Sequence, residues 1–253
     1  MDVDQFPEQI SVRKPHWAVA LAQVVVCCGQ IPTQTAIAAI LMVAGITPEV
    51  DGAVTLSFFA ALTLIDTVVV ITLMKVFLTD SGESSITVFF GARQRPHGPY
   101  NLRREVALGV ISTPMVLVGA LIVVATLRAL VPGLHNVPVS PFESFFTTPA
   151  RAAVFTFVAI VAGGVREELQ RGFLLHRFDQ SLGGMKVGLA IFSVIFGAAH
   201  YTQGYDIAVV TGLLGLFWGW LYLKRRSVAA AMVSHAGFNG TQVLQQLIIK
   251  LAS

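Results

Sequence analysis

The residues of greatest chemical interest are carboxylates, imidazoles and an amide that interrupt otherwise apolar stretches of the chain. They are Glu167, Glu168, His200, His235 and Asn239. A buried carboxyl group is a better base near neutral pH, and together with a histidine it can activate a water molecule. A second histidine and an asparagine amide can donate hydrogen bonds to an oxyanion. These residue types together suit the hydrolysis of an amide bond.

Other hydrolytic mechanisms fit the sequence less well. The chain has no Gly-x-Ser-x-Gly motif, and Cys27 and Cys28 lie in an apolar stretch away from the polar residues, so a serine or cysteine nucleophile is disfavoured. We expect both cysteines to be buried as small apolar residues. No His-Glu-x-x-His motif occurs, and the sequence requires no cofactor, although a zinc site built from glutamate and histidine is an open alternative.

The composition indicates that these residues belong to a membrane protein. Of the 253 residues, 55% are hydrophobic and only 12% are charged, whereas soluble domains carry about 25% charged residues. The 17 Lys and Arg residues exceed the 14 Asp and Glu residues only slightly, so no nucleic-acid partner is expected. The lipid bilayer is the partner that this composition predicts.

Seven apolar stretches approach the roughly 20 residues that a helix needs to cross the hydrocarbon core. They cover approximately residues 17–45, 53–78, 106–131, 149–178, 184–201, 205–223 and 227–250. Gly29, Gln30 and Pro32 interrupt the first, and its division would add an eighth span. We therefore predict an all-α, polytopic transmembrane bundle of about seven, or eight, spans. Residues 1–105 would hold the N-terminal tail, two membrane helices and a basic cytoplasmic loop, and residues 106–253 the catalytic core.

Basic residues gather in alternate connections, and this predicts an orientation because short cytoplasmic loops retain positive charge. These residues are Arg13, Lys14, Arg93, Arg95, Arg103, Arg104, Lys186, Lys224, Arg225 and Arg226. The pattern predicts a cytoplasmic N-terminus. No signal-peptide pattern precedes the first span, and we expect an integral protein of a bacterial inner, or plasma, membrane.

The few charges inside the spans need partners, because a charge at the bilayer centre costs about 2.5–3.5 kcal/mol on insertion scales. We expect Asp66 to hold helices together through a hydrogen bond. Glu167 and Arg171 are four residues apart and can pair on one helix face. His176 and Arg177 are expected nearer the interface, in solvent. The acid, imidazole and amide groups of the three later helices fall at overlapping depths, which predicts one shared cavity.

Three short motifs in this order resemble the signature of the CPBP family, which includes CAAX prenyl proteases, abortive-infection proteins and bacteriocin-processing proteins. That signature is Glu-Glu-x-x-x-Arg, then Phe-x-x-x-His, then His-x-x-x-Asn. The full matches are Phe196 with His200 and His235 with Asn239. The resemblance is best over residues 149–245, and the Ser-Gly-Glu-Ser segment at residues 81–84 resembles the loop that precedes the family's core domain.

The first motif departs from the family pattern, because two residues rather than three separate Glu168 from Arg171. If Arg171 and Gly172 define the register, Glu167 matches the second glutamate and Arg166 replaces the first, which usually has the catalytic role. If the glutamate pair defines the register, Arg171 is displaced by one position. Either Glu167 or Glu168 is therefore the expected base.

The resemblance implies an all-helical bundle whose site opens toward the cytoplasm. One glutamate with His200 would activate water, and His235 with Asn239 would stabilise the oxyanion. Arg171 would orient the glutamates, and Phe196 completes the motif. The implied function is an intramembrane endopeptidase that cleaves a membrane-associated or prenylated, CAAX-type protein or peptide at the cytoplasmic membrane face. A non-catalytic immunity or binding membrane protein is the alternative. A transporter with a proton-relay cavity fits less well, because no inverted repeat is visible.

Overall fold

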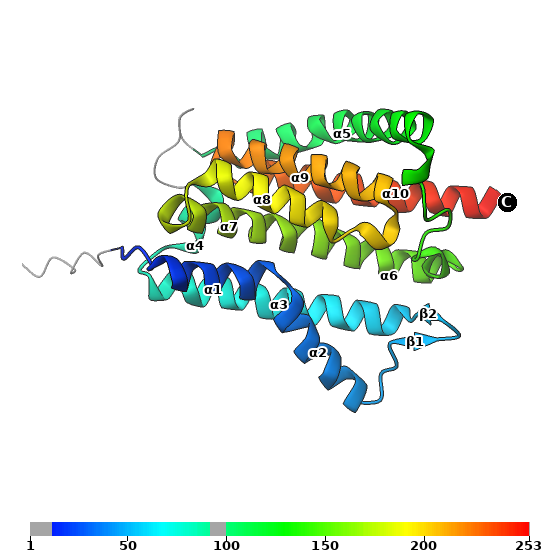
Figure 1. Ribbon diagram of the computed structural model, residues 1–253, viewed down its shortest axis with the longest axis horizontal. Coiled ribbons are helices and arrows are strands. Elements are labelled where there is room, and N and C mark those ends of the chain that lie inside the picture. The colour runs from blue at the N-terminus through cyan, green and yellow to red at the C-terminus, as the bar shows by residue number, and fades with distance from the viewer. Residues whose placement is uncertain (1–11, 92–99, 253) are drawn as a thin grey trace, which may run out of the picture.

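The structure is a computed structural model that describes residues 12–91 and 100–252. Most of its helices run close to a common axis, and α2 visibly leaves that direction (Figure 1). The helices are α1 (Trp17–Cys28), α2 (Ile31–Val43), α3 (Leu56–Asp80), α4 (Ser85–Phe90), α5 (Leu102–Leu130), α6 (Pro149–Ala159), α7 (Glu168–Ser181), α8 (Met185–Ala198), α9 (Tyr205–Arg225) and α10 (Ala229–Ala252). The shorter elements are β1 (Glu49–Val50), β2 (Ala53–Val54), the 3-10 turns η1 (Pro132–Leu134), η2 (Glu143–Phe146) and η4 (Tyr201–Gln203), and the π-helical segment η3 (Ile160–Glu167). The prediction of a helical fold is confirmed.

The first apolar stretch divides at the residues that interrupt it in the sequence. Gln30 has a left-handed conformation with φ 59°, between the end of α1 and the start of α2. Pro32 fits the first turn of α2, because that position needs no backbone donor. The two helices are bent by 42° relative to each other. The bend turns α2 away from the common helix axis (Figure 1), and the antiparallel hairpin of β1 and β2 follows α2 in the chain.

The segments α6, η3 and α7 follow one another without a break, so residues 149–181 form one long helical element with a π-helical middle. Short π-helical segments are frequent at functional sites. Here the segment contains Gly163 and Gly164, and a Cβ atom at Gly164 would lie 2.6 Å from the Cβ of Ala236. The glycines therefore let α10 approach the part of the chain that carries the two glutamates.

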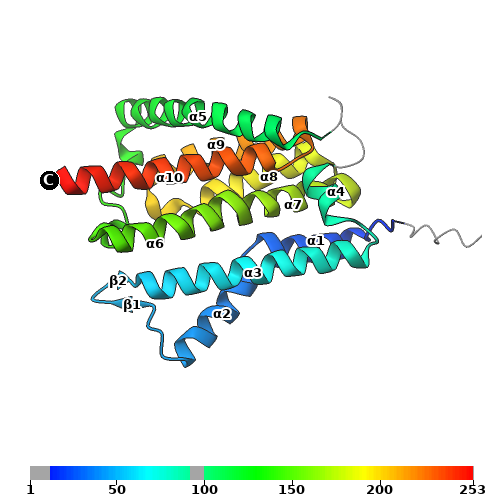
Figure 2. The same ribbon diagram turned by 180° about the vertical axis from the view of Figure 1, so that it is seen from behind.

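The long element lies in the middle of the bundle. In both views α5 runs along one side, and α1 and α3 run along the opposite side (Figures 1 and 2). The largest cluster of buried apolar side chains includes Phe173 of α7, Phe192 of α8 and Trp218 of α9. Small residues bring helices together as well: a Cβ atom at Gly109 of α5 would lie 2.7 Å from the carbonyl oxygen of Ala230 in α10. Such close packing is the main source of helix association in lipid.

Three of the described helices, α3, α5 and α9, are long and apolar enough to cross a membrane, and α1 with α2 would add a fourth if the bent pair is one span. The predicted count of seven is not confirmed. α8 is apolar but has only 14 residues, and the charges at the end of η3 and in α7 interrupt the long element. Large apolar side chains of α5 such as Ile111 and Met115 are exposed, as expected of a surface that faces lipid. The helices support an integral membrane protein.

Several sequence predictions concern features outside these observations. Arg93 and Arg95, which contribute to the predicted orientation, lie outside the described residues. The division near residue 105 and the cytoplasmic N-terminus stay predictions. The two cysteines are free thiols; Cys27 is buried, as expected, and Cys28 is only partly buried.

Candidate active site

The two glutamates stand at the junction of η3 and α7 and have different surroundings. Glu167 is the last residue of η3, and Glu168 is the first residue of α7. Adjacent helical residues point about 100° apart, so the two carboxylates point in different directions. The side chain of Glu168 is 1% exposed, whereas that of Glu167 is 15% exposed.

Glu168 is held by two partners at one carboxylate oxygen. Oε1 of Glu168 forms an ion pair with Nη1 of Arg171 and lies 2.8 Å from Nδ1 of His235. The expected pair between Glu167 and Arg171 is therefore not the one that forms. Arg171 pairs with the residue three positions before it, because positions three apart also share a helix face. The shortened motif thus keeps a contact between glutamate and arginine.

The guanidinium group of Arg171 is fully buried among aromatic rings. It lies over the rings of Phe192, Phe196 and Trp218, with 4.9, 5.2 and 5.7 Å to their centroids. Ring faces attract a cation, and the carboxylate of Glu168 neutralises it. The three rings and the carboxylate together stabilise the buried positive charge of Arg171 in the middle of the bundle.

His235 is fixed on two sides. Its ring stacks on Trp218 with centroids 3.8 Å apart and 16° between the planes, and Nε1 of Trp218 donates a hydrogen bond to Ser234. Because the carboxylate of Glu168 can only accept, Nδ1 of His235 donates to it. The other ring nitrogen, Nε2, faces Oε2 of Glu167 at 3.8 Å. The carboxylate behind the imidazole orients it, as in other hydrolytic sites.

Asn239 lies one turn after His235 on α10, next to the backbone of η3. Its Nδ2 donates a hydrogen bond to the carbonyl oxygen of Ala159 at 3.0 Å. A Cβ atom at Gly163 would lie 3.2 Å from Nε2 of His235 and would collide with the amide of Asn239. Because Gly163 has no side chain, the imidazole of His235 and the amide of Asn239 can both lie against this point of the π-helical segment.

His200 approaches this group through Phe196 rather than by a direct hydrogen bond. Nδ1 of His200 lies 2.8 Å from the carbonyl oxygen of Phe196, and the two rings contact edge to face at 5.0 Å. The ring of Phe196 also meets the ring of His235 at 6.3 Å. Among the described residues, no hydrogen bond joins His200 to Glu167 or Glu168.

The predicted residues thus form one connected group. Glu168 contacts both Arg171 and His235, and Glu167 and Asn239 lie beside His235. The ring of Phe196 lies between the rings of His235 and His200 and contacts both. Within the described part of the chain, no three His, Cys, Asp or Glu side chains gather so that they could hold a metal ion.

Next to the site, Arg166 forms an ion pair with Asp66 that the sequence did not predict. Nη1 of Arg166 donates to Oδ2 of Asp66 in α3 at 3.0 Å, and both side chains are buried. Gln34 of α2 donates to the same oxygen at 3.3 Å. The expectation that Asp66 holds helices together agrees with this geometry, with an arginine as its main partner. In the sequence, the only indication that Asp66 has a partner was the energetic cost of an unpaired charge in the membrane.

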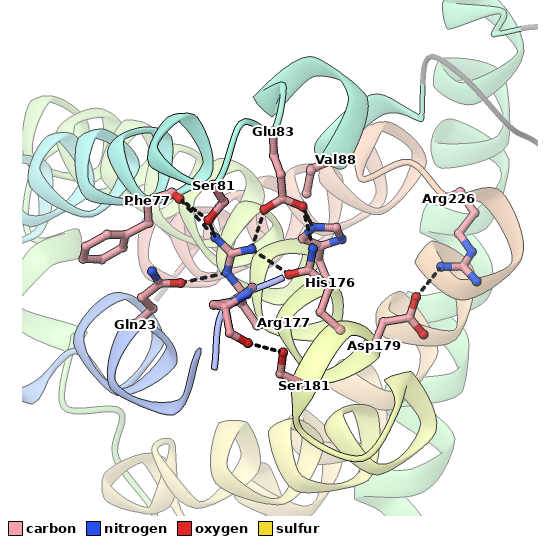
Figure 3. A network of polar contacts seen from close by, with 12 residues as sticks. Gln23, Phe77, Ser81, Glu83, Val88, His176, Arg177, Asp179, Ser181 and Arg226 are labelled. Carbon is pink, nitrogen blue, oxygen red and sulfur yellow. Dashed lines mark hydrogen bonds and ion pairs between the residues drawn. The ribbon is translucent and has the colours of Figure 1, made fainter. Parts of the chain in front are cut away.

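A second polar cluster joins α1, the end of α3 and α7 (Figure 3). Arg177 donates to Gln23 at 2.8 Å, to the carbonyl of Phe77 at 3.2 Å, and to Glu83. The carboxylate of Glu83 also contacts His176. The expectation that Arg177 is in solvent is wrong, because the side chain is fully buried and its hydrogen bonds replace those with water.

This cluster changes the ionisation of Glu83, which lies between α3 and α4. Burial alone would raise its pKa, but hydrogen bonds and charges from His176 and Arg177 outweigh burial and hold the pKa below its ordinary value of 4.5. The signal in the sequence was the Ser-Gly-Glu-Ser segment that contains Glu83, although its partners could not be predicted.

Comparison with known proteins gave one match, to a segment in the second half of the chain. Residues 149–241 match the model of the family described as Rce1-like, Type II CAAX prenyl endopeptidase Rce1-like. The match confirms the family resemblance, and it spans α6, η3, α7, α8, α9 and most of α10. The comparison with curated proteins gave no match, and the comparison with solved structures gave none either.

Proposed function

We propose that this chain, which carries a CAAX prenyl endopeptidase segment of the Rce1-like family, is an intramembrane endopeptidase. Its substrate would be a membrane-associated or prenylated, CAAX-type protein or peptide. The family match over residues 149–241 supports a protease of this type and favours it over a non-catalytic immunity or binding protein. The observation that carries the proposal is the arrangement of Glu167, His235 and Glu168, in which one imidazole lies between two carboxylates.

Glu167 is the general base in this proposal, because Glu168 is already engaged. Oε1 of Glu168 serves both Arg171 and His235, and its side chain is almost inaccessible. Glu167 is more exposed, and its Oε2 faces the ring nitrogen that Glu168 leaves free. A carboxylate next to a site must reach water to act as a base, and of the two only Glu167 combines reach and exposure.

Hydrolysis then proceeds in two steps. Glu167 takes a proton from a water molecule, whose oxygen attacks the carbonyl carbon of the scissile peptide bond. The oxyanion accepts hydrogen bonds from the amide of Asn239 and from Nε2 of the imidazolium of His235, which the carboxylate of Glu168 stabilises. The carbon–nitrogen bond breaks as Glu167 gives its proton to the leaving amine. His200, whose Nδ1 is engaged by a carbonyl oxygen, has Nε2 available to hold the water with Glu167.

The membrane setting supports a bilayer-associated protein or peptide as the substrate. The protein is an integral membrane protein with a helical bundle, and we propose that its N-terminus and its site face the cytoplasm of a bacterial cell. The basic connections identified in the sequence support this orientation. Reporter fusions to residues 46 and 226 would report opposite sides of the membrane if the helices between them cross as proposed.

A cleavage assay tests the proposed function. The purified protein in detergent is incubated with a farnesylated peptide that ends in a CAAX sequence, and fragments are quantified by mass spectrometry. We expect Glu167→Gln to lower the rate by about 10²–10⁴-fold, the usual contribution of a general base. Asn239→Ala should cost about 10²–10³-fold as a lost oxyanion donor. Glu105→Gln is a matched control, because it alters a buried carboxylate that pairs with Arg225 in other helices.

A non-catalytic role would appear in the same assay. Unchanged peptide after incubation with the folded wild-type protein, together with tight binding of the peptide by both wild-type and Glu167→Gln protein, would support binding without hydrolysis.

A further inference from the structure

The ion pair between Asp66 and Arg166 connects the site to a part of the chain outside the matched family segment. Arg166 lies next to Glu167 in η3, and its Nη2 is 3.7 Å from Oε1 of Glu167. Its other terminal nitrogen, Nη1, binds Asp66 of α3 at 3.0 Å. One guanidinium group therefore stands between the proposed base and a carboxylate that comes from a helix 100 residues earlier.

Both members of the pair are shielded from water. The side chain of Arg166 is 5% exposed, and that of Asp66 is not exposed at all. Charges buried in this way interact much more strongly than surface charges, because little water screens them. Removing either charge should therefore be felt by a carboxylate that contacts the same guanidinium group.

We propose that Arg166 and Asp66 are positioning residues that tune Glu167. Arg166 places its positive charge next to Oε1 of Glu167, which leaves Oε2 directed toward His235. Asp66 opposes this effect by sharing the guanidinium group. This inference rests on the proposed function, since it concerns the group that we assign as the base.

The charges around Glu167 come from every element that packs on η3. α10 presents His235, α3 presents Asp66, and α7 contributes the pair of Glu168 and Arg171, which largely cancels. α6 has no charged residue after Arg151, which is at its opposite end. Arg166 is thus the one cation in direct contact with Glu167 within the described residues, apart from a protonated His235.

The same pair reaches the broken first span. Nε2 of Gln34 lies 3.3 Å from Oδ2 of Asp66 and 3.1 Å from Oε1 of Gln30. Gln30 is the residue with the left-handed conformation at the bend between α1 and α2. Gln30 at the bend thus holds Gln34, and Gln34 contacts the ion pair, so that the N-terminal helices contribute to the surroundings of the base.

The pH dependence of kcat/KM for the farnesylated peptide tests this inference. Arg166→Gln removes the cation and should move the acid limb to higher pH by about one unit or more, as expected for an opposite charge within 4–6 Å. Asp66→Asn frees the guanidinium group for Glu167 and should move the limb in the opposite direction. Arg166→Lys keeps a positive charge and should keep the limb near that of the wild type. Glu105→Gln serves again as the control.

Opposite shifts are a result that a merely structural role would not produce, since structural damage lowers activity in both variants without moving the limb. In an Arg166→Gln background, Asp66→Asn should no longer shift the limb. Shifts in the same direction in Arg166→Gln and Asp66→Asn protein, or no shift in folded Asp66→Asn protein, would overturn the inference. If Arg166→Gln does not fold, Asp66→Asn alone still decides the direction. Full activity of Glu167→Gln would instead reject the proposed function.

Discussion

The clearest steric test concerns Gly163, because the space next to its backbone is occupied by the imidazole of His235 and the amide of Asn239. The Cβ atom added by Gly163→Ala would lie 3.2 Å from Nε2 of His235 and would collide with the amide nitrogen of Asn239. Asn239 must then rotate and give up its hydrogen bond to the carbonyl of Ala159. A displacement of about 1 Å in a catalytic group costs about 100-fold in rate, and we expect a loss of that size in kcat/KM.

The fold should tolerate the same change. A lost hydrogen bond costs about 0.5–1.5 kcal/mol, while alanine is favoured over glycine by up to about 1 kcal/mol inside a helix. The free energy of unfolding should therefore change by about 1 kcal/mol or less. Gly119→Ala is the control, because a Cβ atom at that position of α5 meets nothing within 4 Å. Both variants are measured by peptide cleavage and thermal unfolding in detergent. A fully active Gly163→Ala protein would refute the proposed placement of the oxyanion donors.

Three further predictions follow from the contacts of the site and of the second polar cluster. Glu168→Gln leaves the cation of Arg171 buried without its counter-charge, so unfolding should become easier by about 3–5 kcal/mol, measured by chemical denaturation in mixed micelles. Trp218→Leu removes the ring stacked on His235 and should lower kcat more than it changes KM, because the imidazole is no longer fixed. A higher KM with an unchanged kcat would contradict this role. The lowered pKa of Glu83 means that its stabilisation is present above pH 4.5 and is lost as the pH falls through the folded-state pKa. Wild-type protein should therefore lose thermal stability below that pH more steeply than Glu83→Gln protein, and equal slopes would argue against the prediction.

Some groupings within the candidate site could be predicted because its motifs have helical spacing. Residues four apart share a helix face, so the sequence alone indicated that Phe196 and His200 belong together, as do His235 and Asn239. The polarity of these residues within apolar stretches also predicted a common cavity, and the cavity stays a prediction. The structure brings the imidazole of His235 to Glu168, a contact between helices that no spacing along one helix could predict.

Other features depend on contacts between distant parts of the chain. The partner of Arg166 is 100 residues away, and the burial of Arg177 depends on a glutamate in the connection between α3 and α4. A motif that is read along one helix contains neither partner. The π-helical turn was equally invisible, because nothing in the composition of residues 160–167 other than the two glycines distinguishes it from an ordinary helix. The number of spans could not be derived either, since apolar length does not reveal where a helix breaks.

The most direct test of the central claim is the rate at which purified wild-type and Glu167→Gln proteins cleave the farnesylated CAAX peptide under identical conditions. The account predicts that the wild-type protein hydrolyses the peptide and that the folded variant is slower by about 10²-fold or more. Equal rates for the two proteins would contradict the assignment of Glu167 as the group that activates water.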